Sequence, residues 1–140
     1  MKIIIIGGVA GGATAAARIR RLDEKAEIVI FERSGYISYA NCGLPYYIGG
    51  IIDDKEDLTL QTPEGFYRRF RIKAKVGHEV TDIDAKNKTV SVIDLKTGAS
   101  FTESYDKLIL SPGATPILPD SYTENERTFT LRTVEETLKI

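Results

Sequence analysis

Two short apolar runs frame the N-terminal part of the chain. Lys2 to Ile6 is rich in β-branched residues and ends at Gly7, and Ile28 to Phe31 forms a second run of the same kind. Unbroken apolar runs of this length are typical of strands covered on both faces of a parallel sheet. The stretch between them is rich in alanine as far as about Leu22 and favours a helix, because alanine has the highest helix propensity. This order predicts one βαβ unit.

Between Glu79 and Leu110, apolar residues tend to occupy every second position, which is the pattern of an antiparallel sheet. The polar turn at residues 85–88 and the Thr97-Gly98 turn separate the alternating runs, so we expect a β-meander. Lys107 to Leu110 predicts a third buried strand. It ends at 111–116, where proline and glycine break the strand and let the backbone approach a ligand.

Two short helices are also expected. Pro63 suits the first position of a helix that begins at Thr62, and Thr133 to Leu138 has the composition of another. Asp120 to Arg127 is polar and predicts a loop. Together these elements predict an α/β fold, in which a Rossmann-like βαβ unit with a parallel sheet is joined to an antiparallel β-meander.

The glycine cluster of the βαβ unit indicates a nucleotide site. Residues 7–12 read GGVAGG and open the helix, and Glu32 follows Gly12 by 20 residues (32 minus 12) at the end of the second strand. Loop glycines let backbone N–H groups approach a pyrophosphate at the helix N-terminus, and an acid at this spacing binds a ribose hydroxyl. Val9 departs from the usual pattern, which has glycine there. The alternative is a glycine-rich turn in an α/β domain without a nucleotide.

Composition restricts the class of protein. The 140 residues are 42% apolar and 28% charged, with a net charge of -1, which predicts one ordinary globular domain and gives no global reason to expect nucleic acid or a membrane surface. No apolar run approaches the roughly 18 residues of a membrane span. The single cysteine, Cys42, excludes an internal disulfide and fits a reducing compartment, so we expect a cytoplasmic location.

The segment around Cys42 is a candidate redox site. Asn41 is a good N-cap, Pro45 is acceptable only in a first turn, and 49–50 is a glycine pair, so a short helix over Gly43 to Ile48 is predicted. A thiol at the positive end of a helix dipole favours the thiolate. The alternative is that Cys42 is a small buried hydrophobe, as most free cysteines are.

Basic residues supply a candidate anion site. Thr14, Arg18 and Arg21 fall at i, i+4 and i+7 of the predicted helix and therefore share one face. On this evidence alone, a solvated charged face is the competing interpretation. His78, the only histidine, is expected to be structural, because no cluster of metal-ligand residues surrounds it in the sequence.

Four segments carry a resemblance to a known family: KIIIIGGVAGGATAAARIRRLD, IFERSGYISYANCGLPYYIGG, TPEGFYRRF and SYDKLILSPGATP. They resemble the N-terminal part of coenzyme A-disulfide reductases, in the single-cysteine branch of the FAD-dependent pyridine nucleotide-disulfide oxidoreductases. The resemblance covers essentially the whole chain, and valine within the glycine loop belongs to the family pattern. It implies that the fold is part of a three-layer FAD domain.

The resemblance implies roles for individual residues. Cys42 would be the redox nucleophile that forms a mixed disulfide with coenzyme A. Two-cysteine relatives carry a partner cysteine five residues on, where this chain has Tyr47. A substrate-contacting lysine of the family aligns with Phe70, so either Arg69 or Arg71 replaces it or the contact is lost. The implied FAD contacts are Gly7, Gly8, Val9, Ala10, Gly11, Gly12, Glu32, Arg33, Asn41, Cys42, Val80, Ser111, Pro112 and Gly113. The implied coenzyme A contacts are Thr14, Arg18, Arg21, Ser38 and Asn41.

The resemblance also implies that residues 1–140 are the first part of a longer FAD-dependent enzyme, with an NAD(P)-binding domain and a dimerisation domain absent from this chain. The expected activity is reduction of coenzyme A disulfide or persulfide by NAD(P)H in a homodimer, with the fragment alone inactive. The alternatives are an NADH oxidase or peroxidase that cycles Cys42 through a sulfenic acid, and a non-catalytic nucleotide-binding module.

Overall fold

The computed structural model describes residues 1–121 and 127–140. Four parallel strands form one sheet in the order β3-β2-β1-β7, and three antiparallel strands form a second in the order β4-β5-β6. The strands are β1 (Lys2–Ile6), β2 (Glu27–Glu32), β3 (Lys73–Val76), β4 (His78–Asp84), β5 (Thr89–Asp94), β6 (Ser100–Ser104) and β7 (Lys107–Leu110). The helices are α1 (Ala10–Leu22), α2 (Leu44–Ile48), α3 (Pro63–Phe70) and α4 (Val134–Thr137), with 3-10 turns η1 (Asn41–Gly43) and η2 (Lys55–Leu58).

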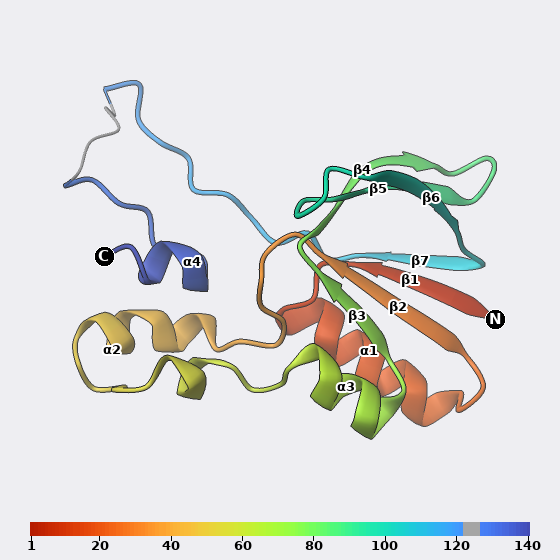
Figure 1. Ribbon diagram of the computed structural model, residues 1–140, viewed down its shortest axis with the longest axis horizontal. Coiled ribbons are helices and arrows are strands. Elements are labelled where there is room, and N and C mark those ends of the chain that lie inside the picture. Colours follow the sequence, from red (N-terminus) through yellow and green to blue (C-terminus); the bar gives the residue numbers. More distant parts are fainter. Residues whose placement is uncertain (122–126) are drawn as a thin grey trace.

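The molecule has three layers. Helices α1 and α3 cover one face of the parallel sheet, and the β4-β5-β6 meander covers the other (Figure 1). Successive residues of a strand point to opposite faces, so Ile3 and Ile5 of β1 pack in the helix-side core, whereas Ile4 packs on the meander side with Val90 and Val92. The unbroken isoleucine run is therefore explained by burial on both faces. The fold class predicted from the sequence is confirmed.

The edge strands differ from the prediction. Lys107 to Leu110 does form β7, but it is not fully buried, and Leu110 is 60% exposed. The reason is that β7 pairs only with β1 among the described residues, so its other edge is open. Strand β3, with two lysines in four residues, was not predicted, because only its pairing with β2 makes it a strand. The expected loop Asp120 to Arg127 lies largely outside the described residues.

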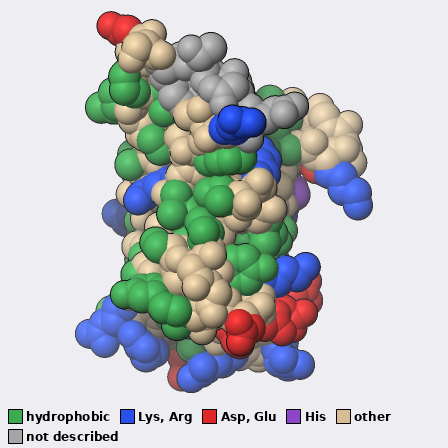
Figure 2. Space-filling model, turned by 90° about the vertical axis from the view of Figure 1, so that its left-hand side faces the viewer, with side chains coloured by type: hydrophobic (Ala, Val, Ile, Leu, Met, Phe, Trp, Pro, Cys, Tyr) green, Lys and Arg blue, Asp and Glu red, His purple; other side chains and the backbone are tan. Residues whose placement is uncertain are grey.

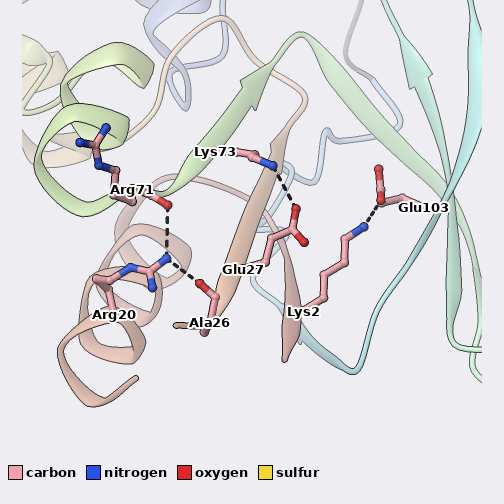
Figure 3. Close-up of polar contacts among 7 residues, drawn as sticks. All are labelled: Lys2, Arg20, Ala26, Glu27, Arg71, Lys73 and Glu103. Carbon is pink, nitrogen blue, oxygen red and sulfur yellow. Dashed lines mark hydrogen bonds and ion pairs between the residues drawn. The ribbon is translucent and has the colours of Figure 1, made fainter. Parts of the chain in front are cut away.

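Arg20 ties α1 to α3 and to the start of β2. Its guanidinium group donates five hydrogen bonds to backbone carbonyl oxygens: Phe70 (2.7 Å), Asp23 (3.1 Å), Glu24 (2.6 Å), Ala26 (2.7 Å) and Arg71 (3.2 Å). Figure 3 shows two of these bonds, to Ala26 and Arg71, beside two ion pairs. Lys73–Glu27 joins the paired strands β3 and β2, and Lys2–Glu103 joins β1 of the parallel sheet to β6 of the meander. All five guanidinium N–H donors are used. Arg20 is thus structural, unlike the arginines next to it on α1.

The end of the molecule formed by α2 and α4 exposes apolar side chains. Figure 2 shows hydrophobic groups along the middle of this face, with Lys and Arg side chains gathered near its lower end. Exposed residues here include Tyr46 and Ile48 of α2, Ile51 shortly after it, and Leu138 and Ile140 after the end of α4. Apolar patches of this kind mark contact surfaces.

Candidate functional site

The glycine loop between β1 and α1 is closely packed against the segment after β7. Gly7 has φ +93°, and a Cβ on it would lie 1.9 Å from the carbonyl oxygen of Ser111. A Cβ on Gly12 would lie 1.8 Å from the carbonyl oxygen of Gly7. Side chains at either position are therefore excluded by backbone atoms, and α1 begins directly above the loop.

The first turn of α1 has unused donors. Val9 is the N-cap residue, it makes no side-chain cap hydrogen bond, and no acidic residue lies in the first turn. The backbone N–H groups at the start of a 13-residue helix are thus left for an outside acceptor. Ala10 and Gly11 of this turn line a cavity of about 520 Å³. A helix N-terminus facing a cavity is a favourable site for phosphate groups.

Glu32 connects both sides of the loop. Its Oε2 accepts a hydrogen bond from the Gly8 N–H (2.7 Å) and its Oε1 accepts one from the Ser34 N–H (2.8 Å), and the residue is only 8% exposed. Each carboxylate oxygen can accept a further bond. Glu32 lines both the 520 Å³ cavity and a neighbouring one of about 340 Å³. Its carboxylate can therefore accept a hydrogen bond from a group bound in either cavity.

The two cavities bring together most of the residues predicted to bind a cofactor. The larger is lined by Val9, Ala10, Gly11, Glu32, Arg33, Asn41, Ser111, Pro112 and Gly113. The smaller shares Glu32, Arg33, Pro112 and Gly113 and adds Gly7 and Val80. Gly8 and Gly12 are buried behind the loop, and Cys42 lines neither cavity.

These residues suit a flavin dinucleotide. The shared lining makes the cavities neighbours, as an elongated ligand requires. Unused N–H donors at α1 match a pyrophosphate, and the Glu32 carboxylate matches a ribose hydroxyl. A Cβ on Gly11 would lie 2.4 Å from Ser111 Oγ, so the absence of a side chain at Gly11 leaves space in the cavity between α1 and Ser111. Both the space and the donor set fit the cofactor that the sequence indicates.

Cys42 lies in the middle of η1 and is exposed. The alternative that it is a buried hydrophobe is therefore wrong. The predicted cap is also wrong: Ala40, not Asn41, occupies the N-cap position of η1, and α2 begins only at Leu44. The 3-10 turn replaces the first predicted turn because the Gly43 N–H donates to the Ala40 carbonyl oxygen at 2.9 Å. Asn41, directly before Cys42, turns toward the large cavity and lines it.

The residues predicted to hold an anionic substrate lie on the surface. Thr14, Arg18 and Arg21 are exposed on α1, and none of the three makes a side-chain hydrogen bond or ion pair with another described residue. Ser38 is half-buried, with φ 49°, and its backbone joins the glycine loop to residue 60: its N–H donates to Gly8 O (2.9 Å) and its carbonyl accepts from Leu60 N (2.9 Å). The arginine pair is open to a solvent-borne anion.

Several residues that line the large cavity were not predicted. Ser34 and Tyr39 are two, and the others, besides Ala114 of the 111–116 segment, come from α4 and its flanks: Arg132, Thr133, Glu135, Glu136 and Lys139. Thr133 and Glu136 form a capping box, a pattern that predicts the helix from sequence but not its place beside the glycine loop. The position of α4 beside the glycine loop depends on a contact between residues 100 positions apart in the sequence. Glu135 Oε1 accepts a hydrogen bond from the Gly35 N–H at 2.7 Å.

His78 has structural contacts. Its Nδ1 lies 2.8 Å from the carbonyl oxygen of Val76, and its ring packs against Phe31 and Phe101. In the part of the chain that the structure describes, no group of three His, Cys, Asp or Glu residues could hold a metal ion. Within the same residues, no helix has both the length and the apolar character needed to cross a membrane.

Comparison with known proteins gives consistent matches. Residues 1–140 match the family described as pyridine nucleotide-disulphide oxidoreductase. The chain is 50% identical over 136 residues to the coenzyme A disulfide reductase of Staphylococcus aureus, covering 97% of this chain and 31% of that protein. It superimposes on reduced Bacillus anthracis CoADR-RHD with a TM-score of 0.94 at 48% identity, covering 99% of this chain and 25% of that one. The water-forming NADH oxidase from Lactobacillus brevis gives 0.91 at 32% identity, covering 99% and 31%.

Proposed function

Because the chain belongs to the pyridine nucleotide-disulphide oxidoreductase family, we propose that it forms the flavin site and carries the redox cysteine of an FAD-dependent NAD(P)H:disulfide oxidoreductase. The observation that carries the proposal is the position of Cys42. It is an exposed thiol whose neighbour Asn41 lines a cavity suited to a dinucleotide. The proposed substrate is coenzyme A disulfide or a coenzyme A persulfide, supported by the 50% identity to a coenzyme A disulfide reductase.

Bound flavin would supply two-electron transfer from NAD(P)H to sulfur. The chemistry of this chain lies in Cys42. Its thiolate attacks one sulfur of coenzyme A disulfide, forming a mixed disulfide and releasing one coenzyme A thiolate. Two electrons and one proton then restore the Cys42 thiolate and release the second coenzyme A as a thiol. With Tyr47 five residues on and no second cysteine in the sequence, this chain offers no internal resolving thiol.

The exposed face of α1 would hold the substrate's phosphates. Arg18 and Arg21 have unused guanidinium donors, and arginine binds phosphate oxygens bidentately. Thr14 lies one turn nearer the loop, and Ser38 and Asn41 lie between the loop and Cys42, so the proposed contacts run from the arginines toward the thiol. Phe70, at the position of the family's lysine, packs edge-on against Phe66 and is partly buried.

The chain spans about a third of the length of the curated relatives it matches, 31% for the first. Accordingly, we propose that the NAD(P)H site and a dimerisation domain belong to further sequence of the complete protein, and that residues 1–140 alone do not turn over. The complete protein would act as a homodimer in the reducing cytoplasm, where an unpaired thiol stays reduced.

The test is NAD(P)H oxidation by the full-length protein with coenzyme A disulfide as the acceptor. We expect turnover by the wild type and none by Cys42→Ser, with FAD still bound by the variant because Cys42 does not line the cavity. Arg21→Ala is expected to raise KM for coenzyme A disulfide about tenfold, since a charge-assisted hydrogen bond contributes about 1.5–3 kcal/mol. Equal turnover by Cys42→Ser and wild type would refute the proposal.

A second candidate is an NADH oxidase or peroxidase that cycles Cys42 through a sulfenic acid. The TM-score of 0.91 to a water-forming NADH oxidase favours it. The two candidates differ in their electron acceptor. Oxygen- or peroxide-dependent NADH oxidation that proceeds without coenzyme A disulfide, and that Arg21→Ala leaves unchanged, would support the second.

A further inference from the structure

Tyr39 is held rigidly beside the large cavity. The residue is 7% exposed, and its ring packs in one apolar cluster with Leu44, Leu58 and Val134. Its backbone forms an isolated antiparallel bridge with Thr59. The ring is therefore packed among residues of α2, η2 and α4.

The hydroxyl group of Tyr39 is not used by the protein. It makes no hydrogen bond with any described residue, yet Tyr39 is part of the wall of the 520 Å³ cavity. The hydroxyl keeps some contact with solvent, so it faces the open space of the cavity rather than the protein interior. Burial, followed by the carboxylates of Glu32 and Glu135, raises the pKa of Tyr39, whereas the Arg132 cation opposes this. The phenol therefore remains a neutral donor at any physiological pH.

The surroundings of this hydroxyl are rich in acceptors. Glu32 uses each of its oxygens once, for Gly8 and Ser34, and keeps further acceptor capacity. Glu135 binds Gly35 through Oε1, and its Oε2 is shielded from solvent without a partner among the described residues. Glu32 and Glu135 line the same cavity as Tyr39 and raise the pKa of its hydroxyl, so this part of the cavity disfavours a phosphate group. The two carboxylates suit a sugar hydroxyl, which can donate to a carboxylate while it accepts from a phenol.

We propose that the Tyr39 hydroxyl binds a sugar hydroxyl of the flavin dinucleotide and is a cofactor-binding group of this cavity. The inference rests on the flavin part of the proposed function. It assigns a role to the one polar atom of the Tyr39 side chain, and it joins the cofactor to the segment that leads, three residues later, to Cys42.

The test compares Tyr39→Phe with Tyr47→Phe in the full-length protein. Tyr47 packs on the same apolar cluster but does not line the cavity, so its hydroxyl is a matched control. For Tyr39→Phe we expect FAD to bind about fivefold to tenfold more weakly by fluorescence titration, the size of one hydrogen bond. The melting temperature of the apoprotein should stay unchanged, because the hydroxyl has no protein partner, while the increase in melting temperature on adding FAD should shrink. Tyr47→Phe should bind FAD as the wild type does.

Two results would overturn the inference while leaving the proposed function intact. One is an FAD affinity equal to that of wild type in Tyr39→Phe. The other is a Tyr39→Phe apoprotein that melts at a lower temperature than wild type, which would show that the hydroxyl is paired inside the protein. A wild-type protein that binds no FAD would instead overturn the proposed function, and this inference with it.

Discussion

Adjacent glycines at the start of α1 should respond in opposite ways to the same substitution. A Cβ on Gly12 would lie 1.8 Å from the backbone carbonyl oxygen of Gly7 and 3.1 Å from the side chain of Ile5. A Cβ on Gly11 would lie 2.4 Å from Ser111 Oγ, the tip of a side chain that can rotate away. Gly12→Ala therefore strains the fold, whereas Gly11→Ala narrows the cavity.

The structure sets the magnitudes. Ordinary contact begins at 3.4 Å, so Gly12→Ala requires a displacement of 1.6 Å (3.4 minus 1.8) between α1 and the loop. Overpacking costs about 1–3 kcal/mol or more, and the better helix propensity of alanine returns at most about 1 kcal/mol. We expect a net loss of about 2 kcal/mol, a fall in melting temperature of roughly 4–8 °C. For Gly11→Ala we expect stability within about 0.5 kcal/mol of wild type and FAD affinity reduced at least about tenfold.

Thermal unfolding of the apoproteins by circular dichroism measures the first quantity, and FAD titration of the same samples measures the second. We expect a crossed result, in which Gly12→Ala loses stability and Gly11→Ala loses FAD affinity. Equal melting temperatures for Gly12→Ala and wild type would refute the packing of α1 on the loop. Unchanged FAD affinity in Gly11→Ala would refute the placement of the dinucleotide at α1.

Three further perturbations probe the scaffold around the site. Arg20→Ala removes five hydrogen bonds to backbone carbonyls and should lower the free energy of unfolding, measured in urea, by about 2–4 kcal/mol. The control Arg21→Ala, at an exposed neighbouring position, should change that free energy by no more than about 0.5 kcal/mol. Equal effects of the two substitutions would contradict the structural role of Arg20. The hydrogen bond from Lys73 lowers the pKa of Glu27, so the pair stabilises the fold above the ordinary carboxyl pKa of 4.5 and the effect is lost as pH falls through the lowered value. NMR titration should show the Glu27 pKa rising in Lys73→Met, and an unchanged pKa would show that the pair is not formed in solution. Thr133→Ala removes the side-chain cap of α4 and should speed hydrogen exchange of the α4 amides about fivefold. Thr133→Ser keeps the capping hydroxyl and should leave the exchange rates unchanged. Equal exchange rates in the two variants would contradict the capping box.

Local patterns predicted the parts of the fold that depend on local contacts. The apolar run at 2–6 predicted β1 with its observed bounds, and the alanine-rich stretch predicted α1 with its observed end at Leu22. Thr62 caps α3 through the Gly65 N–H, as its sequence suggests. Strand β3 escaped prediction because its half-buried, lysine-containing sequence becomes a strand only by pairing with β2. Leu22, the last residue of α1, is 69% exposed, since the buried side of the helix is formed by Gly12, Ala13 and Ala16.

The sequence likewise predicted only those parts of the site that depend on residues close together in the chain. Spacing alone connected the glycine loop with Glu32, because both belong to one βαβ unit. It could not place α4, which reaches the cavity through contacts such as Glu135–Gly35 across the length of the chain. Nor could it decide whether Cys42 is buried, because exposure depends on how η1 packs beside α2. The parts of the cavity wall that come from segments distant in the sequence can be identified only from the three-dimensional structure.

The most direct test of the central claim is an absorbance spectrum together with an intact mass of the full-length protein, purified without added thiols. The account predicts flavin bands and a thiol-reversible mass increase of one coenzyme A, located on the peptide that contains Cys42. Flavin with Cys42 carrying a single oxygen would favour the oxidase or peroxidase instead. A protein without flavin bands would contradict the account.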